Sequence, residues 1–197
     1  MARLKLREWG RSAWPVLLIA ALVVVLDQLI KNWVRQNLAL GDILVISDAL
    51  DGYVVIHHVN NYGAAFGILQ NQGQFFVVIA AVVTLAILIY LRHLPLNQRF
   101  VRVMLGLQMG GALGNVLDRL SQGYVTDYLR VGIPDVYYWP NFNVADSAIV
   151  VGVIGLAGAI LWQDIRAQRA AKQENPPQDS SVQESTMTPL NSAPPEG

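Results

Sequence analysis

Two aspartates, Asp127 and Asp146, lack the close basic partners that would make them simple structural ion pairs. Only Arg130 lies one turn from Asp127, and Asp146 precedes the uncharged run 147–162. If two carboxyl groups meet where water is partly excluded, they cannot both ionise easily, so one keeps a proton and the other acts as a base. Such a pair supplies the acid and the base for hydrolysis by an activated water molecule, without a covalent intermediate.

A second group of polar residues lies within stretches that are otherwise apolar. Asn115 and Asp118 share one helical face, and Arg119 follows Asn115 by one turn. Asp27 and Lys31 have the i, i+4 order that favours an ion pair. A charge in the middle of a membrane costs roughly 2.5 to 3.5 kcal/mol, so such residues need a specific role. These five residues either form a polar scaffold or take part directly in the reaction. The sequence leaves both interpretations open.

The elements that carry these residues are predicted to be membrane helices. The chain is 53% hydrophobic and only 14% charged, which is unusual for a soluble domain. A bilayer core of roughly 30 Å needs about 20 apolar helical residues, and four stretches approach that length. The predicted spans cover residues 14–34, 70–91, 101–120 and 146–163. The fold class expected is therefore an all-α membrane protein with four transmembrane helices.

The first predicted span could also be a cleavable signal peptide, because basic residues precede it. We disfavour this alternative, since no small-residue cleavage site follows the span and three further spans come later in the chain. Cysteine is absent, which excludes disulfides, thiolate nucleophiles and cysteine-ligated metals. No basic block suggests a nucleic-acid partner.

The distribution of basic residues predicts the orientation of the spans. Ten of the fourteen Lys and Arg residues fall on one side, which indicates cytoplasmic termini: Arg3, Lys5, Arg7, Arg11, Arg92, Arg99, Arg102, Arg166, Arg169 and Lys172. Eight aspartates belong to the opposite side: Asp27, Asp42, Asp48, Asp51, Asp118, Asp127, Asp135 and Asp146. The sequence thus predicts a polar site assembled from distant residues at the outer membrane interface.

Two outer segments are predicted to cover this site. In residues 35–69 two β-branched runs, ILVIS and YVVIHHV, are separated by DALDG and predict a small β-hairpin, or cradle, on the membrane. Its adjacent His57 and His58 would point to opposite faces of a strand, so no metal site is expected there. Residues 121–145 contain Gly, Pro and aromatic residues and predict an extracytoplasmic loop at headgroup level.

The remaining features concern packing and the end of the chain. Gly106, Gly110 and Gly114 recur every four residues and predict close contact between helices, rather than a dinucleotide site, which would need a preceding strand. Residues 173–197 are rich in Pro, Ser, Gln and Glu, so a single domain over 1–172 and a disordered cytoplasmic tail are expected.

Five motifs in register resemble the lipoprotein signal peptidases, also called signal peptidase II, a family of bacterial membrane aspartic proteases. The motifs are DQLIK (27–31), NYGAAF (61–66), GGALGNVLDR (110–119), VTDY (125–128) and FNVAD (142–146). Together they cover roughly residues 12–165, and their common order makes the resemblance specific. Gly67 stands where the family often has Ser, so no side-chain hydrogen bond is expected from that position.

The resemblance implies a catalytic pair, Asp127 and Asp146, that needs no cofactor and no metal. It implies a second set of residues that shape the site and bind the substrate: Asn61, Gly63, Asn115, Asp118, Arg119, Asn143 and Ala145. Asp27 and Lys31 are implied to give structural support. The implied substrate is a prolipoprotein that already carries a diacylglyceryl group, cut just before its lipidated cysteine. A monomer in the bacterial inner membrane, in contact with lipids and with its site at the periplasmic face, is expected.

Three other interpretations compete with this one. A small transporter could use Asp127 and Asp146 as a cation or proton site, but the acids cluster at one membrane face and not at the midplane. A serine hydrolase would need a supporting histidine motif, which the sequence lacks. A scaffold in which both aspartates merely cap helices is the third alternative.

Overall fold

The computed structural model of the chain describes residues 2–63 and 68–174. Part of the NYGAAF motif and Gly67 therefore lie outside the described residues, as does the predicted tail beyond Glu174. The chain divides into two compact units, Met1–Ala159 and Ile160–Gly197, and the fourth long helix runs from the first into the second. The predicted tail from residue 173 onward stays a prediction.

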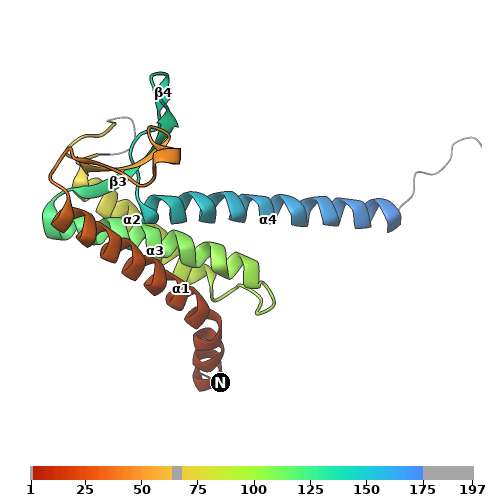
Figure 1. Cartoon of the computed structure of the whole chain (residues 1–197). Coiled ribbons are helices and arrows are strands. Elements are labelled where there is room, and N and C mark those ends of the chain that lie inside the picture. The colour runs from red at the N-terminus through yellow and green to blue at the C-terminus, as the bar shows by residue number, and fades with distance from the viewer. Residues whose placement is uncertain (1, 64–67, 175–197) are drawn as a thin grey trace, which may run out of the picture. The chain divides into compact units, whose positions relative to one another are not determined.

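Four long helices dominate the structure (Figure 1). Each of them is long and apolar enough to cross a membrane, which confirms the predicted class of four-span membrane protein. The helices also extend beyond most of the predicted spans, because polar residues continue the helical turns at the ends. Their bounds are α1 Ala2–Asn37, α2 Gly73–Tyr90, α3 Arg99–Gln122 and α4 Val144–Glu174.

Helix α3 is the central helix of the first unit. In the most apolar stretch of α3, 56% of the residues are buried, compared with 11% in α2. Most side chains of α2 are therefore exposed to lipid. Helix α3 packs against both α1 and α2, and the three lie side by side in Figure 1. It ends at Gly123, whose φ of 82° is left-handed and whose N–H donates to the Arg119 carbonyl.

A four-stranded antiparallel sheet with the order β1-β2-β3-β4 joins the ends of the helices (Figure 1). Strand β1 (Ile43–Val45) pairs with β2 (Val54–Asn61), which confirms the predicted hairpin, and a short 3-10 helix, η1 (Asp48–Leu50), lies between them. The segment predicted as a loop between spans three and four instead contributes β3 (Val125–Ile133) and β4 (Tyr137–Tyr138).

The pairing of β2 with β3 has a direct consequence for the predicted site. In this register Asp127 lies opposite Val59, and Thr126 lies opposite Asn60. The end of β2 therefore brings Asn61 next to the VTDY motif, although more than sixty residues separate them in the sequence. The pairing could not be read from the local pattern, because β3 carries a Gly and polar residues within its hydrophobic alternation.

The glycines of α3 allow the close helix contacts that were predicted. A Cβ atom on Gly110 would lie 2.7 Å from Val23 Cβ and 2.8 Å from the Ala20 carbonyl oxygen of α1. On Gly111 it would overlap the Ala145 carbonyl of α4. Both distances to α1 are shorter than normal van der Waals contact, so α1 and α3 touch through their backbones at this level.

We expect Gly110→Leu to destabilise the fold, because a larger side chain must push α1 away from α3. Gly158→Leu is the matched control, since a Cβ on Gly158 of α4 has open space around it. Both substitutions raise helix propensity by the same amount. The difference in stability between the two variants therefore reports the cost of overpacking at position 110, which is about 1 to 3 kcal/mol. Thermal unfolding in detergent measures this difference, and equal midpoints for the two variants would contradict the close packing.

Candidate active site

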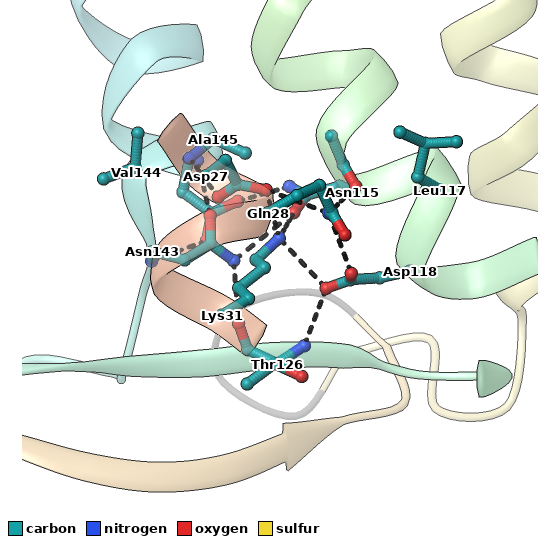
Figure 2. Close-up of polar contacts among 12 residues, drawn as sticks. Asp27, Gln28, Lys31, Asn115, Leu117, Asp118, Thr126, Asn143, Val144 and Ala145 are labelled. Carbon is teal, nitrogen blue, oxygen red and sulfur yellow. Dashed lines mark hydrogen bonds and ion pairs between the residues drawn. The ribbon is translucent and has the colours of Figure 1, made fainter. Parts of the chain in front are cut away.

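Most of the predicted site residues come together where four elements meet: the C-terminal halves of α1 and α3, strand β3, and the first turn of α4. Figure 2 shows this meeting point, with α1 crossing between the start of α4 and the end of α3. The residues that lie there belong to segments far apart in the sequence, as the topology argument predicted.

Lys31 is the centre of the polar contacts at this meeting point (Figure 2). Its Nζ lies 2.8 Å from Asp27 Oδ2, 3.0 Å from Asp118 Oδ2 and 2.9 Å from Asn115 Oδ1. The side chains of Lys31, Asp27 and Asp118 are fully buried, with 0% exposure. All three ammonium donors are thus satisfied, as a buried cation requires. The predicted ion pair between Asp27 and Lys31 is present.

The two carboxylates of this cluster also reach the neighbouring elements. The Ala145 N–H of α4 donates to Asp27 Oδ1 at 2.9 Å, and the Thr126 N–H of β3 donates to Asp118 Oδ2 at 3.1 Å. Gln28 adds a further link, because its Nε2 donates to Asp118 Oδ1 at 3.0 Å. The buried charges of α1 and α3 therefore fix the positions of both elements that carry the candidate catalytic aspartates.

Asp146 and Asn143 cap the N-terminus of α4 reciprocally. The Asp146 N–H donates to Asn143 Oδ1 at 2.9 Å, and the Asn143 N–H donates to Asp146 Oδ2 at 3.2 Å. This is an arrangement of the capping-box type, in which two residues three apart satisfy each other's backbone donors. The other oxygen of Asp146, Oδ1, accepts a hydrogen bond of 2.7 Å from Asn115 Nδ2.

Asp127 faces the same asparagine from β3. Asn143 Nδ2 donates to Asp127 Oδ1 at 2.7 Å, and Asn61 Nδ2 donates to Asp127 Oδ2 at 2.9 Å. The carboxyls of Asp127 and Asp146 therefore bind the same residue, Asn143. Asp127 is 2% exposed, and burial, together with the nearby charge of Asp146, raises its pKa to about 7.

Arg119 and Gly63 lie at the edge of this group. Arg119 Nη2 donates to the Gly63 carbonyl at 3.1 Å, and its guanidinium stacks over the Phe76 ring at 4.7 Å. The Gly63 N–H in turn donates to Asn61 Oδ1 at 2.9 Å. Arg119 therefore fixes the backbone at Gly63. Gly63 in turn fixes the side-chain amide of Asn61, which faces Asp127.

Several residues of the site were not singled out by the sequence. Thr126 is fully buried, and its hydroxyl accepts a hydrogen bond of 3.0 Å from Arg35 Nη1, which also lies 3.6 Å from Asp118 Oδ1. Tyr128 was expected among the headgroup-level aromatics but is only 2% exposed, and its hydroxyl accepts from the Val144 N–H at 3.3 Å. Arg35 follows Lys31 by one helical turn, and this spacing was the sequence signal that could have placed Arg35 near the site.

The histidines of β2 bind different partners, and because a register shift lies between Ile56 and Val59, the opposite faces expected for the two rings stay a prediction. A ring nitrogen of His57, Nδ1, lies 3.1 Å from Asn141 Nδ2, whereas His58 Nδ1 lies 3.0 Å from the Leu38 carbonyl. Within the described residues no group of three or more His, Cys, Asp or Glu side chains is placed to hold a metal ion.

The arrangement can supply an acid and a base to a hydrolytic reaction. Two carboxyl groups share one asparagine, and the pKa of Asp127 lies close to neutral pH, so a single proton can be held between them. The salt bridges found in the described part of the chain join Lys31 and Arg35 to Asp27 and Asp118, and none of them includes Asp127 or Asp146.

Comparison with known proteins identifies the family of this chain. A family model described as signal peptidase (SPase) II matches residues 19–162. The chain is 43% identical over 147 residues to the lipoprotein signal peptidase of Moorella thermoacetica, which covers 75% of this chain and 93% of that relative. It is 41% identical over 137 residues to the lipoprotein signal peptidase of Bacillus subtilis, with 70% of this chain and 86% of the relative covered.

The fold has a solved counterpart. A bacterial membrane enzyme, determined by the in meso method at 2.3 Å resolution, matches with a TM-score of 0.69 and 32% identity. The match covers 76% of this chain and 89% of that one. These findings give no support to the transporter alternative. With a family match over most of its length and four helices that can cross a membrane, this chain belongs to the signal peptidase II family and is a multi-pass membrane protease.

Proposed function

We propose that this protease removes the signal peptide from diacylglyceryl-modified prolipoproteins, cutting just before the lipidated cysteine. Its family and its relatives, which are lipoprotein signal peptidases, support the substrate class. The observation that carries the proposed mechanism is that Asn143 hydrogen-bonds to the carboxyls of both Asp127 and Asp146. This arrangement supports an aspartic endopeptidase with these two residues as its catalytic pair.

In the proposed reaction the pair starts with one proton. The ionised carboxylate accepts a proton from a water molecule, and the oxygen of that water attacks the scissile carbonyl. The protonated carboxyl donates its proton to the carbonyl oxygen, which gives a neutral tetrahedral intermediate. As this intermediate collapses, one of its hydroxyls returns a proton to the carboxyl that acted as the acid, the C–N bond breaks, and the proton gained from water passes to the departing amine of the cysteine. No cofactor takes part in these steps.

The remaining predicted site residues support this chemistry in distinct ways. Asn61, Asn115 and Asn143 orient the two carboxyls by hydrogen bonds of 2.7 to 2.9 Å. Arg119 holds Gly63 at the rim, where the substrate backbone would pass. Ala145 is fully buried and must stay small, because its carbonyl and Cβ lie against the glycines of α3.

We further propose that the site faces the periplasm, with both termini in the cytoplasm of a bacterial cell and the protein acting as a monomer in the inner membrane. The distribution of basic residues supports this orientation. Exposed apolar and aromatic side chains near the β3–β4 turn, Val136, Tyr137 and Trp139, suit contact with lipid headgroups. A lipid-anchored substrate that diffuses in the outer leaflet would reach a site at this depth.

The catalytic roles are tested by Asp127→Asn and Asp146→Asn. Either change should lower the rate of precursor cleavage about 100- to 10,000-fold, because the pair loses its acid or its base. An Asn side chain keeps only one of the two oxygens that accept hydrogen bonds, so thermal unfolding in detergent is measured beside the cleavage rate to show that each variant is folded. Asp135→Asn is the matched control, because Asp135 is exposed and its φ of 59° suits Asn. Cleavage of a lipidated precursor by purified protein measures the effect, and full activity in either site variant would remove that residue from the pair.

The pH dependence follows from the raised pKa of Asp127. Burial and then Asp146 favour the protonated carboxyl, so the shared proton is held below about pH 7 and is lost as the pH rises through that value. The rate should therefore fall above about pH 7, with an apparent pKa that belongs to the pair. In Asn61→Leu the fall should move to higher pH, because a hydrogen bond that stabilises the carboxylate is removed. A pH–rate profile that is identical in both proteins would contradict this assignment.

The orientation is tested by cysteine labelling, since the natural chain contains no cysteine. Val136→Cys lies in the outer segment and Leu96→Cys lies between α2 and α3, and these side chains are 76% and 58% exposed. A membrane-impermeant maleimide should label position 136 in cells whose outer membrane is opened, and position 96 only after the inner membrane is lysed. The reverse pattern would overturn the proposed orientation.

A further inference from the structure

The three asparagines that face the candidate catalytic pair are each held in one orientation by a group that can only donate a hydrogen bond. Asn143 Oδ1 faces the Asp146 N–H, and Asn61 Oδ1 faces the Gly63 N–H, both at 2.9 Å. Asn115 Oδ1 faces the Lys31 ammonium, also at 2.9 Å. Because the carbonyl oxygen is fixed in each case, the amide nitrogen must point the other way, toward a carboxyl oxygen.

Lys31 differs from the other two donors in an important respect. The donors to Asn143 and Asn61 are backbone N–H groups of the same local segment, whereas Lys31 belongs to α1 and lies 84 residues away in the sequence. It is also fully buried, so no water molecule competes for Asn115 Oδ1 from that side. The orientation of the Asn115 amide thus depends on one distant side chain.

We propose that Lys31 is a positioning residue for peptide hydrolysis, acting through Asn115 on Asp146. The ammonium holds Asn115 Oδ1, and this turns Asn115 Nδ2 toward Asp146 Oδ1 at 2.7 Å (the Lys31 and Asn115 side chains are drawn in Figure 2). This role goes beyond the structural support expected for Lys31, and it rests on the proposed catalytic function of Asp146.

Loss of the ammonium would remove the main reason for this amide orientation. The other donor to Asn115 Oδ1 is Asn143 Nδ2, at the longer distance of 3.3 Å, and it already donates to Asp127 at 2.7 Å. A flipped amide would present a carbonyl oxygen to Asp146, so the carboxylate would lose a donor and gain a repulsive neighbour. The shared proton would then be held more tightly, and the carboxylate would be a poorly placed base.

Several charged or titratable groups surround Asp146, and a change in its proton affinity must be separated from their direct effects. They come from three elements: Asp27 and Lys31 on α1, Arg119 on α3, and Asp127 and Tyr128 on β3. A simple loss of the Lys31 charge would also act on Asp146 through space. The test variant therefore has to keep the net charge of the buried cluster.

The double variant Lys31→Met, Asp118→Asn satisfies this condition. The cluster of Asp27, Lys31 and Asp118 carries one net negative charge in the natural chain, and it carries one in the double variant. Removing Lys31 alone would leave Asp27 without a cation and Asp118 with only the guanidinium of Arg35 at 3.6 Å, so the buried cluster would gain an uncompensated negative charge. Gln28→Leu is the control, because Gln28 donates to Asp118 at 3.0 Å in the same cluster but makes no contact with Asn115 that would orient its amide.

The measurement is the pH profile of kcat and KM for cleavage of a lipidated precursor, with thermal unfolding followed in parallel. In the double variant we expect kcat to fall about 100-fold, as for a misplaced catalytic group, with KM unchanged and the high-pH fall in rate shifted upward. Gln28→Leu should lower the unfolding temperature but keep the natural pH profile. If the double variant folds and keeps the natural kcat and pH profile, the proposal is wrong.

Asn115→Leu identifies the route of the effect. If Lys31 acts through Asn115, the double substitution should cause no further shift of the pH profile in an Asn115→Leu background, whereas a direct charge effect would add to it. An additive shift would overturn the proposal. The outcomes also separate this proposal from the proposed function. Full activity in Asp146→Asn would reject the catalytic function itself. If Asp146→Asn is inactive and the shift is additive, only the role of Lys31 is rejected.

Discussion

The structure depends on one buried cation. Lys31 is fully buried among Asp27, Asp118 and Asn115, and an ammonium in such a place is tolerated only if every partner is in position. Each carboxylate of this cluster also accepts a backbone N–H, from Ala145 at the start of α4 and from Thr126 on β3. Four elements are thereby held in one relative arrangement, because any displacement would leave a buried charge without its partner.

The candidate catalytic residues use the same kind of constraint on a smaller scale. Asp146 caps its own helix together with Asn143, so the interpretation of Asp146 as a helix cap and its interpretation as a catalytic acid are compatible. The cap fixes the Asp146 carboxyl at the start of α4. The side-chain amide of Asn143 also donates a hydrogen bond to Asp127 on β3, so it fixes the position of both carboxyls. A residue that was expected to shape the site therefore links the two acids directly.

Much of this could be predicted from the sequence, because membrane helices and local pairs leave strong signals. The i, i+4 spacing of Asp27 and Lys31 gave their ion pair, and the hydropathy gave the four helices. Strand β3 was missed, because its partner β2 lies far away in the sequence and pairing of that kind has no local pattern. The burial of Tyr128 and the contact of Arg35 with Thr126 follow from that pairing, so they could not be expected without it.

The position of the site explains why so many amides surround two carboxyls. Burial on strand β3, together with the nearby charge of Asp146, raises the pKa of Asp127 to about 7, which keeps a proton available near neutral pH but also makes the carboxylate costly to form. Amide donors lower that cost without adding a positive charge, which would hold both acids in the ionised form and remove the proton that the reaction needs. The ammonium of Lys31 accordingly binds Asn115 and not Asp146, and the neutral Asn115 amide is the group that donates a hydrogen bond to Asp146.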